Sequence, residues 1–334
     1  NFGTTIGPLL VSFAIFGSAA AGGTEASIES VKIPYLVLGA AFVLVAVFLK
    51  FSSVPNQVDL DALAADETSD ASKLAHKSSA FGYPQLVLGM IAIFVYVGVE
   101  VSTISNMPAY LELPVSEGGL GIETSLIAPF VSLYWASLMI GRWAGAAGAF
   151  DVAKHTKWML TILLPYLAFG VFLAVNAFAN HEISHFFMYG FVIVLMIAAT
   201  FASRGNPARM LLYFAICGIA ALVIGMLTTG MTSVVAFISV GLFCSTMWPC
   251  IFTLAITGLG RNTNQGSSLL IMMIMGGGIV SWLQGVIADM HGIHYSFVVG
   301  VLCFAYLAFY AVAAKHALQK QGIDLDALTA QGGH

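Results

Sequence analysis

The chain alternates long apolar runs with short polar turns, and this pattern repeats along most of its length. A helix needs roughly 20 consecutive apolar residues to cross a bilayer. Runs of this kind lie at residues 2–21, 33–50, 84–108, 124–147, 157–178, 184–203, 209–229, 233–258, 266–288 and 295–314. The pattern therefore predicts an all-α, polytopic membrane protein with about ten transmembrane helices.

One long polar segment, residues 52–82, interrupts the apolar runs and indicates a soluble linker. Lysine and arginine concentrate on the cytoplasmic side of membrane proteins. Placing this segment in the cytoplasm puts every lysine and arginine there except Lys32, while acidic residues such as Asp289 fall outside. A miscounted helix would mix the two groups, so the charge partition supports the predicted number of helices.

Composition narrows the class of protein further. The chain of 334 residues is 59% hydrophobic and 8% charged, with a mean hydropathy of +0.92. An average soluble domain carries roughly 25% charged residues, so the predicted environment is a lipid bilayer. The net charge of −4 and the absence of a basic patch argue against a nucleic-acid partner.

Motifs for catalysis or metal binding are not found in the sequence. The four cysteines lie in apolar runs without ligand spacing, and the pair His181 and His185 is typical of a solvated loop, so no metal site is predicted. A Ser-His-Asp set, a Walker loop and a dinucleotide fingerprint are likewise missing. We therefore predict neither an enzyme nor an ATP-driven pump, and an ion is the expected energy source.

Residues 241–292 read as two apolar helices joined by a polar turn, and both helices contain residues that interrupt helical structure. The first has Trp248-Pro249 in mid-run, and the second has three consecutive glycines, 276–278. Transporters bind substrates near such interruptions. Pro249 has no N–H, so the carbonyl of Ser245 loses its helical partner and needs another donor, for which water or a ligand in a cavity is a candidate. Trp248 is interpreted either as a flat face for a sugar or as a packing residue.

Glu100 is the clearest charged residue within an apolar run. A charge at the bilayer centre costs about 2.5–3.5 kcal/mol on insertion scales and is therefore a candidate functional group. Helical spacing places Tyr96, Glu100, Thr103 and Met107 on one face. Two interpretations stand: the carboxyl binds substrate hydroxyls or carries a proton, or it bonds structurally to a neighbouring helix.

Other polar and small residues complete the set of candidates. Arg142, near the cytoplasmic end of its run, fits a gate or an anchoring ion pair, and equally a snorkelling side chain. One of Tyr134 and Trp135 is expected to face the cavity, and Gln284 is a rim or cavity residue. The predicted substrate-binding residues are Tyr96, Glu100, Tyr134, Trp135, Ser245, Trp248 and Gln284, and the predicted gating or structural residues are Arg142, Pro249, Gly276, Gly277, Gly278 and Asp289.

Five stretches together resemble the fucose/glucose/galactose–proton symporter family of the major facilitator superfamily. The five stretches are NFGTTIGP, FVYVGVEVS, YWASLMIGRWAG, FCSTMWPCIFTLAITGLGRNTNQGSS and IMGGGIVSWLQGVIADMHGIHYSF. The last two are the most specific. The resemblance implies a monomeric sugar transporter of a bacterial inner membrane, with the proton as coupling ion and no other cofactor. It also implies that Glu100 and Trp248 line the sugar cavity, and that position 100 is more similar to the glucose/galactose members.

The resemblance also implies a domain organisation for a chain that lacks its first four helices. Residues 1–51 would be the last two helices of the N-terminal bundle, 52–83 the central loop, 84–316 the C-terminal bundle with a two-helix insert at 157–203, and 317–334 a cytoplasmic tail. Two alternatives remain open: an exporter of drugs or other metabolites on the same scaffold, and a non-transporting membrane sensor.

Overall fold

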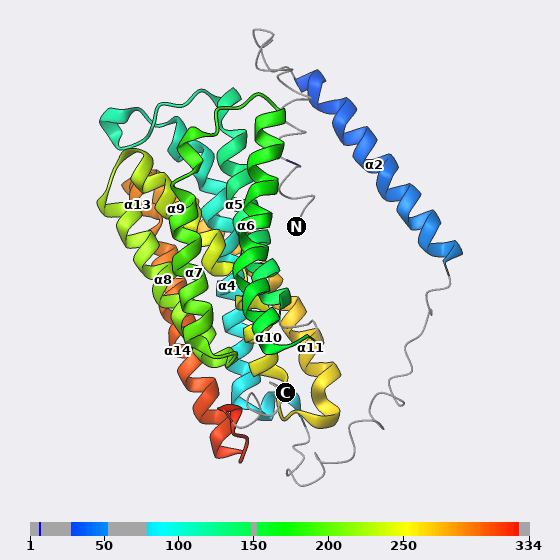
Figure 1. The fold of residues 1–334 in the computed structure, drawn as a ribbon. Helices are drawn as coiled ribbons and strands as arrows, with labels where there is room; N and C mark the ends of the chain where they lie inside the picture. Colours follow the sequence, from blue (N-terminus) through cyan, green and yellow to red (C-terminus); the bar gives the residue numbers. More distant parts are fainter. Residues whose placement is uncertain (1–6, 8–27, 53–78, 148–151, 327–334) are drawn as a thin grey trace.

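The computed structural model describes residues 7, 28–52, 79–147 and 152–326, and these residues form helices and turns without a strand (Figure 1). The α-helices are α2 (Ile28–Phe51), α4 (Pro84–Glu112), α5 (Ala128–Ala146), α6 (Lys154–Phe178), α7 (Tyr189–Ser203), α8 (Pro207–Leu227), α9 (Gly230–Cys244), α10 (Met247–Ile256), α11 (Thr263–Met272), α12 (Gly276–His291), α13 (Ile293–Ser296) and α14 (Val298–Lys320). The predicted all-α fold is confirmed.

Eight stretches of helix in the described residues are long and apolar enough to cross a membrane. They run from Pro84–Glu112 to Ile293–Lys320, and each coincides with one of the predicted runs between residues 84 and 314. The predicted helix at 33–50 corresponds to α2. The predicted helix at 2–21 lies outside the described residues except for Gly7, as does most of the polar segment 52–82.

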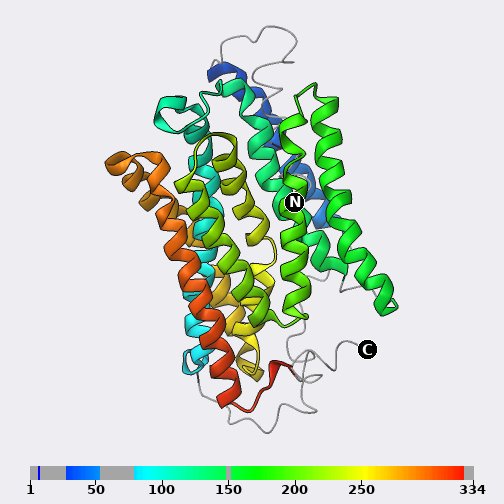
Figure 2. The ribbon, with the colours of Figure 1, turned by 60° about the vertical axis from the view of Figure 1, so that its left-hand side comes forward.

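Helix α2 lies apart from the other helices (Figure 1), and its side chains from Tyr35 to Phe51 are exposed. The remaining helices pack without it into one bundle. Within that bundle α4 is central, because it contacts α9, α10, α12 and α14. Helices α6 and α7, which cover the predicted insert, lie at the side of the bundle (Figure 2), with α6 against α5 and α7 against α8.

Charged residues separate between the two ends of the bundle. Successive membrane-length stretches run in opposite directions, so α4 and α8 begin at the end where α5 and α14 finish (Figure 1). Every lysine and arginine between residues 79 and 326 belongs to this end, which we call the basic end: Arg142, Lys154, Lys157, Arg204, Arg209, Arg261, Lys315 and Lys320. The opposite end, the acidic end, carries Glu112, Glu117, Glu123, Glu182 and Asp289.

At the basic end, the segment after α14 folds back over the bundle. Gln85 at the start of α4 and Gln321 exchange hydrogen bonds of 2.8 and 3.2 Å through their amide groups. Gln85 also donates to the carbonyl of Thr257, which follows α10. The two amides therefore join the ends of α4, α10 and α14.

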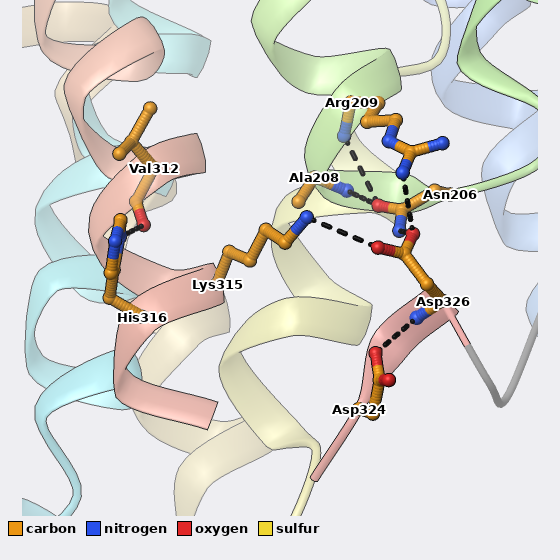
Figure 3. A network of polar contacts seen from close by, with 8 residues as sticks. All are labelled: Asn206, Ala208, Arg209, Val312, Lys315, His316, Asp324 and Asp326. Atoms are coloured by element: carbon orange, nitrogen blue, oxygen red, sulfur yellow. Dashed lines mark hydrogen bonds and ion pairs between the residues drawn. The ribbon is translucent and has the colours of Figure 1, made fainter. Parts of the chain in front are cut away.

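Asp326 joins a further pair of helices at this end (Figure 3). Its carboxylate lies 3.1 Å from Arg209 of α8 and 3.2 Å from Lys315 of α14, and it accepts a hydrogen bond from the side chain of Asn206. The Lys315 ammonium that donates to this carboxylate lowers the pKa of Asp326 below its ordinary value. The carboxylate is therefore ionised at neutral pH and holds the two helix ends together.

Candidate functional site

Two membrane-length stretches are broken near the middle, where the proline and the glycines predict it. The first stops as α9 at Cys244 and resumes as α10 at Met247, so the break is at Ser245-Thr246. The second passes from α11 through a 3₁₀ segment, η10 (Met273–Met275), into α12 at Gly276. Helix α4 contacts both α10 and η10. The two breaks are therefore arranged around the helix that carries Glu100.

Gly276 sets the distance between the second break and α4. A Cβ atom added at Gly276 would overlap the carbonyl oxygen of Phe94 in α4. The next two glycines are less restricted: a Cβ at Gly277 would lie 3.2 Å from Val97, and at Gly278 nothing lies within 4 Å. Of the three glycines, Gly276 is thus the one whose missing side chain permits the close helix contact.

The Ser245 carbonyl, which Pro249 leaves without a helical partner, accepts a hydrogen bond from a protein side chain. Arg142 of α5 donates from its Nε to the carbonyl oxygen of Ser245 at 3.3 Å. The sequence indicated that this carbonyl needs another donor, with water or a ligand as candidates, and the structure shows a protein side chain in that role. Arg142 and Ser245 are 103 positions apart in the chain, so their proximity is a property of the packed helices.

Ser245 uses its hydroxyl within its own helix. The side chain is fully buried, and Oγ donates to the carbonyl of Leu242 at 2.6 Å. It lies against Gly141 of α5, where an added Cβ would overlap Oγ. This close approach brings Arg142, the residue after Gly141, alongside the break. The structure thus places the Ser245 hydroxyl against α5, and its predicted role in substrate binding stays a prediction.

Glu100, Tyr96 and Trp248 come together from α4 and α10. The rings of Tyr96 and Trp248 have centroids 6.1 Å apart at an interplanar angle of 59°. The Tyr96 hydroxyl lies near the Glu100 carboxyl without meeting the geometry of a hydrogen bond, and it is buried without a partner in the described part of the chain. Glu100 also lies within electrostatic range of Arg142. Tyr96 is thus a neighbour of both Glu100 and Trp248, and the predicted role of these two residues in sugar binding stays a prediction.

Arg142 and Trp248 face a common open space. Together with Ser245 and Pro249 they line a cavity of ≈ 420 Å³. Ligand-binding pockets commonly measure roughly 300–1,000 Å³. An aromatic face, a guanidinium donor and a nearby carboxylate acceptor suit a small ligand that presents both C–H faces and hydroxyl groups. We call the cavity that these four residues line the upper cavity.

The other predicted substrate-binding residues differ in how they are placed. Tyr134 is fully buried and donates from its hydroxyl to the carbonyl oxygen of Glu100 at 2.7 Å, so it positions the backbone that carries the carboxyl. Trp135 packs edge-on against Tyr134 and is half-buried. Gln284 is buried and donates to Ser296 at 3.3 Å, toward the acidic end. None of the three lines the upper cavity.

Two features of the site were missed in the sequence. Thr246 is buried at the break, and its Oγ1 has no hydrogen-bond partner in the described residues. The polar pair Ser245-Thr246 just before Trp248-Pro249 is a signal that could have identified it. The bond between Arg142 and the Ser245 carbonyl has no comparable local signal, because it depends on how α5 packs.

We expect Arg142→Ala to destabilise the protein and Pro249→Ala to offset part of that loss. The first change leaves a buried carbonyl unpaired, which costs about 1–3 kcal/mol. The second supplies an N–H that can bond to the same carbonyl within the helix. A double-mutant cycle on the free energy of unfolding should give a coupling of roughly 1 kcal/mol between the two sites. Strictly additive effects on the free energy of unfolding would contradict the interpretation that both substitutions act on the Ser245 carbonyl.

The fold is that of a major facilitator superfamily transporter. The transporter FucP, solved in the outward conformation, superimposes with a TM-score of 0.53 at 21% sequence identity, over 93% of this chain and 69% of that chain. A second structure, of the E. coli fucose:proton symporter FucP, gives a TM-score of 0.55 at 21% identity, over 94% and 66%. No family model matches the chain.

Sequence comparison identifies relatives whose names match the family that the sequence resembles. The chain is 32% identical over 312 residues to the glucose/galactose transporter of Brucella abortus, covering 93% of this chain and 60% of that protein. It is 24% identical to the L-fucose–proton symporter of Escherichia coli, covering 84% of this chain and 51% of that protein. The predicted resemblance is confirmed: the chain is a multi-pass membrane protein homologous to these transporters, none of them named as an enzyme. It spans about 60% of the length of the Brucella protein.

Proposed function

We propose that this chain is the C-terminal part of a proton-coupled monosaccharide transporter that works by alternating access. The observation that supports it best is the meeting of Glu100, Tyr96 and Trp248 beside a cavity at a broken helix. The homology to proteins named glucose/galactose transporter and L-fucose–proton symporter agrees with this chemistry. The exporter and sensor alternatives have no comparable support.

In this proposal the ring of Trp248 packs against the C–H face of the sugar. Glu100 accepts hydrogen bonds from sugar hydroxyls, and Tyr96 donates or accepts one with its unpartnered hydroxyl. Because the cavity is open, the remaining sugar contacts would come from the part of the transporter outside the described residues.

The proposed orientation follows the charge distribution, and the proposed organisation follows the resemblance to the symporter family. The basic end would face the cytoplasm of a bacterial inner membrane, since lysine and arginine favour that side. Residues 52–83 would form the central loop, 84–316 the C-terminal bundle with α6 and α7 as an insert, and 317–334 the tail. The transporter would act as a monomer, with the proton as its coupling ion.

Uptake by the full-length protein in vesicles tests this function. We expect labelled glucose or galactose to accumulate when an inward proton gradient is imposed. Collapsing the gradient with a protonophore should abolish accumulation while leaving sugar exchange intact. Accumulation that does not respond to the gradient would contradict proton coupling. The absence of both uptake and exchange for glucose, galactose and fucose would contradict the assignment as a sugar transporter.

A further inference from the structure

A second cavity is also lined by Arg142 and Ser245. It measures ≈ 380 Å³ and shares Arg142, Ser245 and Pro249 with the upper cavity. Its other walls include Thr246, Met210 and Cys250. We call it the lower cavity. Because the two cavities have these three residues in common, they adjoin each other at the contact between Arg142 and the Ser245 carbonyl.

The lower cavity opens toward the basic end of the bundle. Its lining includes Gly205 and Pro207, which form the turn between α7 and α8 at that end. It also includes Gly145 in the last turn of α5. Under the proposed orientation, this cavity therefore lies between the upper cavity and the cytoplasm.

Thr246 is a buried polar residue in the lining of the lower cavity. The residue is only 6% exposed, and its Oγ1 has no hydrogen-bond partner among the described residues. A buried hydroxyl without a partner loses free energy relative to a hydroxyl in water, unless something that enters the site bonds to it. Since the other threonine of this cavity, Thr253, is exposed, Thr246 is the group most in need of a ligand.

We propose that the lower cavity is a second monosaccharide subsite on the cytoplasmic exit route, and that the Arg142–Ser245 contact is the gate between it and the upper cavity. This inference rests on the proposed function. A sugar hydroxyl would bond to Thr246 Oγ1, and the sulfur-bearing side chains of Met210 and Cys250 would contact its C–H face. Passage would require Arg142 to exchange the Ser245 carbonyl for a sugar hydroxyl, so the gate opens to a ligand with hydrogen-bond acceptors.

The test compares the two directions of transport by the full-length protein in proteoliposomes. Thr246→Val keeps the shape of the side chain and removes the hydroxyl. We expect the KM for sugar presented at the cytoplasmic face to rise about threefold to tenfold, the effect of losing one hydrogen bond. The KM for sugar presented at the outer face should stay unchanged. Thr246→Ser, which keeps the hydroxyl, should restore the cytoplasmic KM.

A purely structural role for Thr246 would move both KM values together, and that outcome would overturn the proposal. An unchanged cytoplasmic KM would overturn it as well. If the wild-type protein transports sugar but either of these results is found, only the second subsite fails. If the wild-type protein transports no sugar in either direction, the proposed function itself fails.

Labelling of the unmodified protein provides a second measurement that does not depend on a variant folding. Cys250 lines the lower cavity, whereas Cys217 on α8 lines neither cavity. We expect saturating glucose or galactose to slow modification of Cys250 by a small thiol reagent added from the cytoplasmic side. Modification of Cys217 should not change. Equal labelling of Cys250 with and without sugar would overturn the proposal.

Discussion

Gly276→Ala is expected to cause the largest loss of stability among single changes at the helix breaks. The added methyl group would overlap the carbonyl oxygen of Phe94, which belongs to the backbone of α4 and cannot rotate away. Overpacking in a well-packed interior typically costs about 1–3 kcal/mol, and contact with an immobile atom favours the upper end. The measurement is the thermal unfolding midpoint of the full-length protein in detergent, together with its expression level.

The neighbouring glycines provide matched controls for this prediction. An alanine at Gly278 meets nothing within 4 Å, and it should be neutral or stabilise by about 0.5–1 kcal/mol through reduced backbone entropy. An alanine at Gly277 would lie 3.2 Å from Val97 and should fall between the two. The expected unfolding midpoints therefore decrease in the order Gly278→Ala, Gly277→Ala, Gly276→Ala. Equal midpoints for the first and last would show that the contact with Phe94 is not tight.

Glu100→Gln is expected to weaken sugar affinity more than any other conservative substitution in the site. A carboxylate that accepts hydrogen bonds contributes about 1.5–3 kcal/mol per bond, so the dissociation constant should rise roughly 10- to 150-fold. The amide keeps the size of the side chain, and therefore the packing against Tyr96 should be preserved. Binding to the purified full-length protein, measured by calorimetry or by quenching of tryptophan fluorescence, gives the dissociation constant directly.

Glu112→Gln is the matched control for Glu100. It lies at the acidic end of the same helix, where its exposed carboxylate accepts a hydrogen bond from Thr124 at 2.7 Å. Sugar affinity should be unchanged in this variant. A structural role for Glu100 would lower the unfolding midpoint of Glu100→Gln along with its affinity. Normal affinity in Glu100→Gln would remove Glu100 from the binding site.

The helices and their interruptions were predictable because they depend on local properties of the chain. Eight of the predicted apolar runs became membrane-length helices, since a bilayer leaves backbone groups no partner except within a helix. Pro249 and the glycines at 276–278 marked the two breaks within a few residues, because proline removes a donor and glycine weakens the helix. The resemblance to known transporters predicted that Glu100 and Trp248 line one cavity, and this stays a prediction.

The partners of particular polar groups were not predictable in the same way. Gln284 looked like a rim or cavity residue, and it is buried against Ser296 because α12 and α13 pack together there. Tyr134 was expected near the substrate, and its hydroxyl instead bonds to the backbone of Glu100. In both cases a side chain on one helix forms a hydrogen bond with a group on another helix. The spacing of residues along one helix does not predict such a bond.

By itself the sequence determined an all-helical membrane protein, the separation of its charges between two ends, and the positions at which two of its helices break. Each of these depends on residue types and spacing along one stretch of chain. Only the tertiary structure decided that Arg142 donates to the carbonyl freed by Pro249, and that the nearby Thr246 is buried with no hydrogen-bond partner for its hydroxyl among the described residues. The physical reason is that hydrogen bonds between helices depend on how closely they approach, and that distance is set here by small residues such as Gly141.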